Sequence, residues 1–103
     1  MVIDKELKVH IFITICEESI KFLKLTNFSS FTALMNFTYD SIMKKEENLP
    51  RVVLRLQISV VHELKLIYGF NEMTCSLYFF EFFEKRRWVD YEEIARYFID
   101  TKQ

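Results

Sequence analysis

Apolar and polar side chains follow the period of an α-helix over most of the chain. In residues 4–25, 30–47, 51–68 and 72–87, apolar positions recur three and four residues apart, and polar positions fill the opposite side. This spacing is typical of helices that bury one face. A further helix is expected from Asp90 toward the C-terminus. The pattern predicts an all-α fold, a compact bundle of four principal helices plus a short C-terminal helix.

The stretch 51–68 also fits a second structure. Residues 54–60 alternate apolar and polar side chains, so a half-buried strand over 52–60 is also possible. We favour a helix because the helical period continues through the whole stretch, whereas the alternation stops early. An α+β fold with a strand or hairpin in 52–68 is the alternative.

Capping and turn residues separate the expected helices. Ser29 and Ser30 offer an N-cap, and Pro50 marks the start of a new element. Gly69 stands where a helix is expected to end, and Asn71 can cap the next one. The chain holds one Gly and one Pro, so the residues that hairpin turns require are scarce. This scarcity favours helices joined by short connections.

Within the segment 75–88, residues 77–83 form a run of Leu, Tyr and Phe that only Glu81 interrupts, and a charged run ends it. So little of its circumference is polar that we expect this helix in the middle of the bundle, surrounded by the others. Phe79 and Phe83 are expected in the core. The cations of residues 85–87 fall in its last turn, where the helix dipole favours them.

Length and charge limit the classes of protein. A chain of 103 residues is long enough for one hydrophobic core, so we expect a single domain, 1–103. The net charge is -1, and neither half of the chain is strongly basic or acidic. No apolar run is long enough to span a membrane, and the first residues are charged, unlike a signal peptide. These observations predict a cytoplasmic protein with no membrane partner.

Aromatic residues make up 17% of the sequence, which is a large load for one small core. Part of this surface is expected to be covered by a protein partner or by a second copy of the chain. A well-filled aromatic core is the other explanation. The candidate partner-binding residues are expected at the ends or edges of helices: Trp88, Phe70, Tyr97, Arg86 and Arg87.

Catalytic and metal-binding patterns are not found in the sequence. Cys16 and Cys75 lie on apolar faces without CxxC spacing, so we expect buried, reduced thiols. Glu6, His10 and Glu17 share one face of the first helix, but they lack the Glu-x-x-His spacing of bundle metal sites. One Gly cannot build a phosphate-binding loop or a nucleophile elbow. The sequence therefore predicts no enzyme, no metal and no cofactor.

The leading hypothesis is a small non-enzymatic protein-interaction or regulatory module that forms a homodimer. The alternative is a nucleic-acid-associated transcriptional regulator. That regulator would use the basic helix face of Arg51, Arg55 and Lys65 together with residues 85–87. A recognition helix after Gly69 is not expected, because the helix that follows offers aromatic and acidic side chains to a DNA groove.

Overall fold

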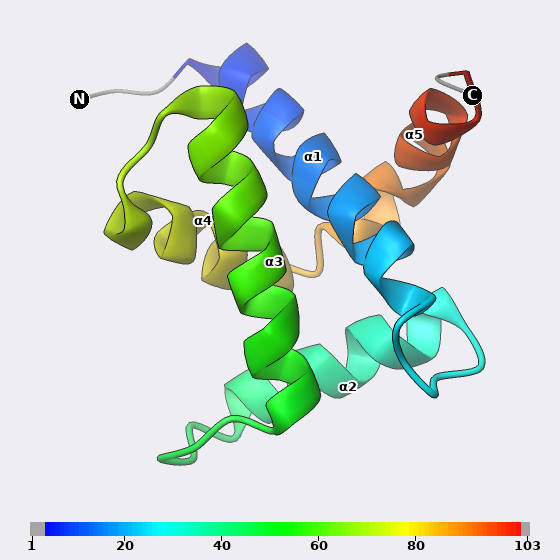
Figure 1. The fold of residues 1–103 in the computed structure, drawn as a ribbon, viewed down its shortest axis with the longest axis vertical. Helices are drawn as coiled ribbons and strands as arrows, with labels where there is room; N and C mark the ends of the chain where they lie inside the picture. Colours follow the sequence, from blue (N-terminus) through cyan, green and yellow to red (C-terminus); the bar gives the residue numbers. More distant parts are fainter. Residues whose placement is uncertain (1–3, 102–103) are drawn as a thin grey trace.

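A computed structural model describes residues 4–101, and within them the chain forms five helices and no strand. The helices are α1 (Lys5–Leu23), α2 (Phe31–Met43), α3 (Arg51–Tyr68), α4 (Glu72–Glu84) and α5 (Trp88–Thr101) (Figure 1). The all-α prediction is confirmed, and the strand alternative in 52–68 is not needed. None of these helices is long and apolar enough to cross a membrane within the described residues.

Helix α1 is the element around which the other helices are arranged. It packs against α2, α3, α4 and α5, and Figure 1 shows it between α3 and α5, with α2 across one end. Its buried positions are spread around a wide arc that includes Ile11, Phe12, Ile13 and Ile15. A helix that is apolar over such an arc can contact neighbours on several sides.

The prediction that the Phe-rich helix lies in the middle is therefore wrong. Helix α4 buries one face, but on its opposite side Met73 is 74% exposed and Leu77 is 65% exposed. Hydropathy alone did not show which of two apolar helices is surrounded, because both α1 and α4 carry more apolar side chains than one buried face requires.

The buried apolar side chains of all five helices form one cluster. Its largest fully buried members come from α4, since Phe79, Phe82 and Phe83 are each 0% exposed. The Phe83 ring lies 4.8 Å from that of Phe79 and 5.0 Å from that of Phe82, measured between centroids. These separations are typical of aromatic pairs in protein cores. The expectation that Phe79 and Phe83 are core residues holds.

The helix starts follow the capping residues of the sequence. Ser30 accepts a hydrogen bond from the Ala33 N–H at 3.1 Å, and Asn71 accepts one from the Thr74 N–H at 2.8 Å. Both are N-cap contacts of the expected kind. Gly69 closes α3 with φ of 71°, a left-handed conformation that glycine adopts without strain.

Helices α2 and α4 end three or more residues earlier than predicted. α2 ends at Met43 rather than near residue 47, and α4 ends at Glu84 rather than 87. In each case the turn beyond the end holds a residue in the left-handed region: Lys45 has φ of 53° and Arg86 has φ of 51°. Glycine is the usual residue there, so a sequence with lysine and arginine at these positions gave no sign of the ends.

Candidate functional site

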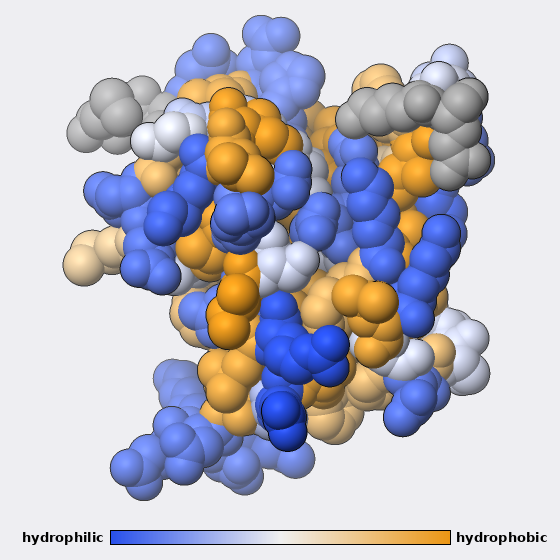
Figure 2. All heavy atoms as spheres, in the orientation of Figure 1, coloured by the Kyte–Doolittle hydropathy of each residue, from blue (hydrophilic) through white to orange (hydrophobic). Residues whose placement is uncertain are grey.

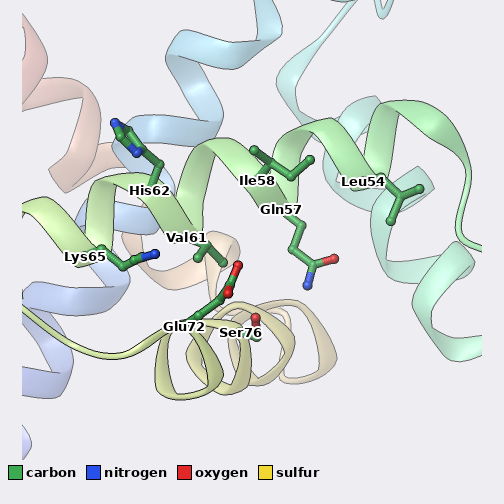
Figure 3. Close-up of a pocket in the computed structure, with 8 residues that line it drawn as sticks. All are labelled: Leu54, Gln57, Ile58, Val61, His62, Lys65, Glu72 and Ser76. Atoms are coloured by element: carbon green, nitrogen blue, oxygen red, sulfur yellow. The ribbon is translucent and has the colours of Figure 1, made fainter.

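The candidate site is a groove between α3 and α4, drawn in Figure 3. Its volume is about 360 Å³. We call it the α3–α4 groove and define it by its lining residues: Leu54, Gln57, Ile58, Val61, His62 and Lys65 from α3, with Glu72 and Ser76 from α4. Its size lies within the range of about 300–1,000 Å³ that is common for binding pockets in proteins.

Local sequence accounts for the two walls. Leu54, Ile58, Val61 and Lys65 are spaced four, three and four residues apart, so they lie along one side of α3. The three residues between the helices include Gly69, whose left-handed conformation ends α3 and lets α4 return beside it. The groove therefore lies between two consecutive helices.

Apolar side chains remain exposed along this face. Leu54 is 43% exposed and Ile58 is 69% exposed, while Val61 between the two helices is buried. The adjoining outer side of α4 adds the exposed Met73 and Leu77. Figure 2 shows apolar side chains interleaved with hydrophilic ones on the face where α3 lies. Apolar residues gathered on one face mark surfaces that a partner covers.

The groove also carries one charge of each sign. Lys65 belongs to α3 and Glu72 to α4, and Figure 3 shows their side chains directed into the groove from opposite walls. His62 points away from α4 in the same view. The α3 side of the groove therefore combines three apolar residues with Gln57, His62 and Lys65, and one ammonium and one carboxylate lie at the end near the α3–α4 turn.

The structure places Trp88 in the core, which corrects the prediction that it lies uncovered at a helix edge. The indole is 3% exposed, and its ring lies 5.9 Å from Phe83 and 6.3 Å from Tyr39. Helix α5 begins at Trp88 rather than at Asp90. This first residue of the helix is one of its buried residues. A side chain this deeply buried does not offer a surface to a partner.

The other two aromatic candidates differ in exposure. Phe70 is half-buried in a stack of rings, 5.5 Å from Tyr68 and 5.7 Å from Tyr78. Tyr97 is 65% exposed on α5, where its ring meets Phe98 edge-on at 5.8 Å. Neither residue lines the α3–α4 groove. Of these two candidates, only Tyr97 offers most of its side chain to a partner.

The basic candidates fall into separate places. Arg55 lies over the Phe22 ring of α1, 5.8 Å from its centroid, and Lys65 lines the groove. Arg51 is the exposed first residue of α3. At the α4–α5 turn, Arg87 pairs with Asp90 at 3.3 Å, and Lys85 lies 3.7 Å from Glu81. Several of these cations therefore have contacts within the chain.

Arg86 has an unusual structural role. It occupies the left-handed position of a Schellman motif, in which the Arg86 N–H donates to Phe83 O at 3.0 Å and the Arg87 N–H donates to Phe82 O at 2.9 Å. Its guanidinium carbon lies 4.2 Å from the Tyr39 ring centroid. The contact with Tyr39 offsets the strain of placing a non-glycine residue at this position.

This balance predicts different effects for two substitutions at position 86. Arg86→Gly relieves the left-handed strain and loses the Tyr39 contact, so the free energy of unfolding should change by less than about 0.5 kcal/mol. Arg86→Ala loses the contact and keeps the strain, so it should destabilise by about 0.5–1 kcal/mol. Urea denaturation of both variants measures the difference. Equal stabilities of the two variants would show that strain at this position is negligible.

Both thiols are buried, as expected. Cys16 and Cys75 are free and 0% exposed. Burial, together with the nearby Glu92 carboxylate, raises the pKa of Cys16 to about 12, and burial also raises the pKa of Cys75. Such thiols stay protonated at neutral pH. Within residues 4–101, no three His, Cys, Asp or Glu side chains gather in a way that could hold a metal ion.

The groove was not predicted from the sequence, although two apolar residues of 51–68 lie outside the buried face of the helix. Leu54 and Ile58 were read as part of a possible strand because they alternate with polar residues. In the helix, Leu56 and Val60 are buried, whereas Leu54 and Ile58 fall on another side and stay exposed. Apolar residues left over after the buried face is assigned are the signal that could have located this surface.

No protein-family model, no curated protein and no solved structure matches the chain.

Proposed function

We propose that this chain is a non-enzymatic protein-interaction module that pairs with a second copy of itself through the α3–α4 groove. The observation that carries the proposal is the exposure of Leu54 and Ile58 beside the groove, with Met73 and Leu77 on the adjoining side of α4. Two copies related by a twofold axis would cover these side chains from water, and burial of apolar surface drives such association.

Helix α3 is long enough to form the centre of a dimer interface. It has 18 residues, so it is about 27 Å long. Helix α4 crosses α3 at a steep angle (Figures 1 and 3). A second copy centred on the groove would therefore lie along α3 and also cover the adjoining outer side of α4, since a standard interface buries about 800 Å² on each partner.

The charges of the groove suit self-association. A twofold interface brings the same surface together twice, so a residue that contacts another across it also receives the reverse contact. The lining contributes one cation, Lys65, and one carboxylate, Glu72. Two copies can therefore meet without net repulsion and can pair these charges across the interface.

Ile58→Glu tests the proposal, because it places a carboxylate among the apolar residues beside the groove. Ile58 is 69% exposed, so the variant should fold with nearly unchanged stability as a monomer. In the dimer the carboxylate would be desolvated at both symmetry-related positions, which should weaken association about 100-fold or more. Sedimentation velocity over micromolar concentrations gives the dissociation constants of the wild type and the variant.

Leu66→Glu is the matched control. Leu66 is 67% exposed on the same helix and does not line the groove, so this variant should dimerise like the wild type. A wild-type chain that stays monomeric throughout the concentration range would contradict the proposal. A dimer of unchanged affinity in Ile58→Glu would place the interface somewhere other than the groove, and equal loss of dimer in both variants would show that the effect is not specific to the groove.

The nucleic-acid alternative remains a prediction with less support from the arrangement of charges. Arg55 lies over Phe22, and Arg86 lies over Tyr39, so these guanidinium groups make contacts with different helices of the bundle. Titration with duplex DNA at two salt concentrations tests it, because binding through phosphate contacts must weaken steeply with salt.

A further inference from the structure

A second hollow lies where the start of α1 meets the α4–α5 turn. Its volume is about 260 Å³, and six residues line it: Lys5, Lys8, Val9, Phe12, Arg87 and Tyr91. We call it the cationic pocket. Three of the six carry a positive charge and none carries a carboxylate, although the chain as a whole has a net charge of -1.

Helix geometry explains why cations so distant in sequence converge. Lys5, Lys8, Val9 and Phe12 are three and four residues apart, so they share one side of α1. Arg87 follows the left-handed Arg86, at the turn between α4 and α5. Because α1 packs against both α4 and α5, this turn lies beside the first turns of α1.

Two of the three cations of the pocket, Lys8 and Arg87, form ion pairs with carboxylates of the chain. Lys8 Nζ lies 2.6 Å from Glu81 Oε2, and Arg87 Nη1 lies 3.3 Å from Asp90 Oδ2. Lys85 also lies 3.7 Å from Glu81. The three lining cations, Lys5, Lys8 and Arg87, are therefore set against two carboxylates, which leaves a local excess of one positive charge. An anion entering the pocket meets cations that are already held in place.

Two of the residues that line the pocket are aromatic, the buried Phe12 and the half-buried Tyr91. The Phe12 and Tyr91 rings lie 6.0 Å apart between centroids, and Lys8 Nζ lies 5.8 Å from the Phe12 centroid. Val9 adds an apolar side chain that is 38% exposed. A lining that combines cations with aromatic rings is complementary to a molecule that has one anionic end and one apolar body.

We propose that the cationic pocket binds a small organic anion, in which a phosphate or carboxylate group is attached to an aromatic or compact apolar body. The anionic group would lie against Lys5 and Arg87, and the body against Phe12 and Tyr91. The volume of about 260 Å³ lies just below the usual range of about 300–1,000 Å³ for drug-sized ligands. It therefore fits a ligand of roughly one ring and one anionic group.

Phenyl phosphate and benzoate are suitable probes, because they carry the two anionic groups on the same ring. Titration monitored by ¹H–¹⁵N spectra should move the amide signals of Lys8, Phe12 and Tyr91, with at least one of the two probes saturating. Inorganic phosphate, which has the charge alone, and benzyl alcohol, which has the ring alone, should bind at least about 10-fold more weakly, since each lacks one contact.

Lys5→Gln is the test variant, and Lys24→Gln is its matched control at the other end of α1. Both lysines are exposed, so both variants should fold. Lys5→Gln should weaken binding of the saturating probe about 10-fold, as expected for loss of one charge-assisted contact. Lys24→Gln should leave binding unchanged. The Ile58→Glu variant should bind like the wild type, so the result does not depend on dimerisation.

Three results would overturn the proposal. The first is failure of both phenyl phosphate and benzoate to move signals of the pocket. The second is equal weakening by Lys5→Gln and Lys24→Gln, which would mean that the anions respond only to overall charge. The third is inorganic phosphate binding as tightly as phenyl phosphate while benzoate does not bind, which would show that the Phe12 and Tyr91 rings do not contribute to binding.

Discussion

Replacing Phe83 with alanine is expected to lower the free energy of unfolding by about 3–5 kcal/mol, the usual range for removal of a buried ring. The side chain is 0% exposed and lies within 6 Å of three other rings, with centroid separations of 4.8 Å to Phe79, 5.0 Å to Phe82 and 5.9 Å to Trp88. Its removal would leave a cavity that these rigid neighbours cannot fill. Denaturant unfolding measures the change.

The effect is large relative to the roughly 5–15 kcal/mol of stability that a domain usually has. The Phe83→Ala chain is therefore expected to be partly unfolded at moderate temperature. Leu66→Ala is the control, since Leu66 is 67% exposed outside the groove and should change stability by less than about 0.5 kcal/mol. A Phe83→Ala variant as stable as the wild type would contradict the packing of α4 against the core.

Stability should also fall as the pH rises above 9. The pKa of the Cys16 thiol is raised from 9.0 to about 12, mainly by burial, whereas in the unfolded chain the thiol has its ordinary pKa. Between these two values the folded chain keeps a proton that the unfolded chain releases, so rising pH favours unfolding. The contribution of Cys16 should be intact below pH 9 and about 2–3 kcal/mol smaller at pH 11.

Cys16→Ala isolates this contribution. Its absolute stability differs from that of the wild type because the side chain is smaller, so the quantity to compare is the slope of unfolding free energy against pH. The slope between pH 9 and 11 should be shallower in Cys16→Ala, with a remainder from Cys75 and Tyr78, whose pKa values are also raised by burial. Identical slopes in both proteins would show that Cys16 ionises as readily in the folded chain as in the unfolded chain.

The sequence was sufficient to predict the helices and several of their limits. Ser30, Gly69 and Asn71 have the cap positions expected of them, because N-caps and left-handed C-caps depend on a few local atoms. Glu81 and Lys85 are four residues apart in the sequence, a spacing that favours an ion pair on a helix, and their charged groups lie 3.7 Å from each other. Helix caps and ion pairs one turn apart depend on residues close in sequence, so they can be predicted without knowledge of the fold.

The arrangement of the helices was harder to predict. The central position of α1 and the burial of Trp88 depend on which helices meet, and that is decided by packing between residues distant in sequence. The ends of α2 and α4 were missed because Lys45 and Arg86 adopt a conformation in which glycine is usual. At Arg86, the contact that accompanies this conformation is with Tyr39, on another helix.

The candidate surfaces were missed for a related reason. Each combines elements whose alignment only the fold provides: the groove joins Ile58 of α3 with Ser76 of α4, and the cationic pocket joins Lys5 of α1 with Arg87. Arg87 was among the predicted interaction residues, but nothing in the sequence placed it beside Lys5. Composition indicated surplus apolar surface without indicating where it lies.

The central claim is that two copies of the chain pair through the α3–α4 groove. Isotope-filtered NOE spectroscopy on a mixture of labelled and unlabelled chains tests it most directly, because it detects only contacts between copies. The account predicts intermolecular cross-peaks from the methyl groups of Leu54 and Ile58 and none from Leu66. Intermolecular cross-peaks confined to Val89 and Ile94 of α5, or none from any methyl group, would contradict it.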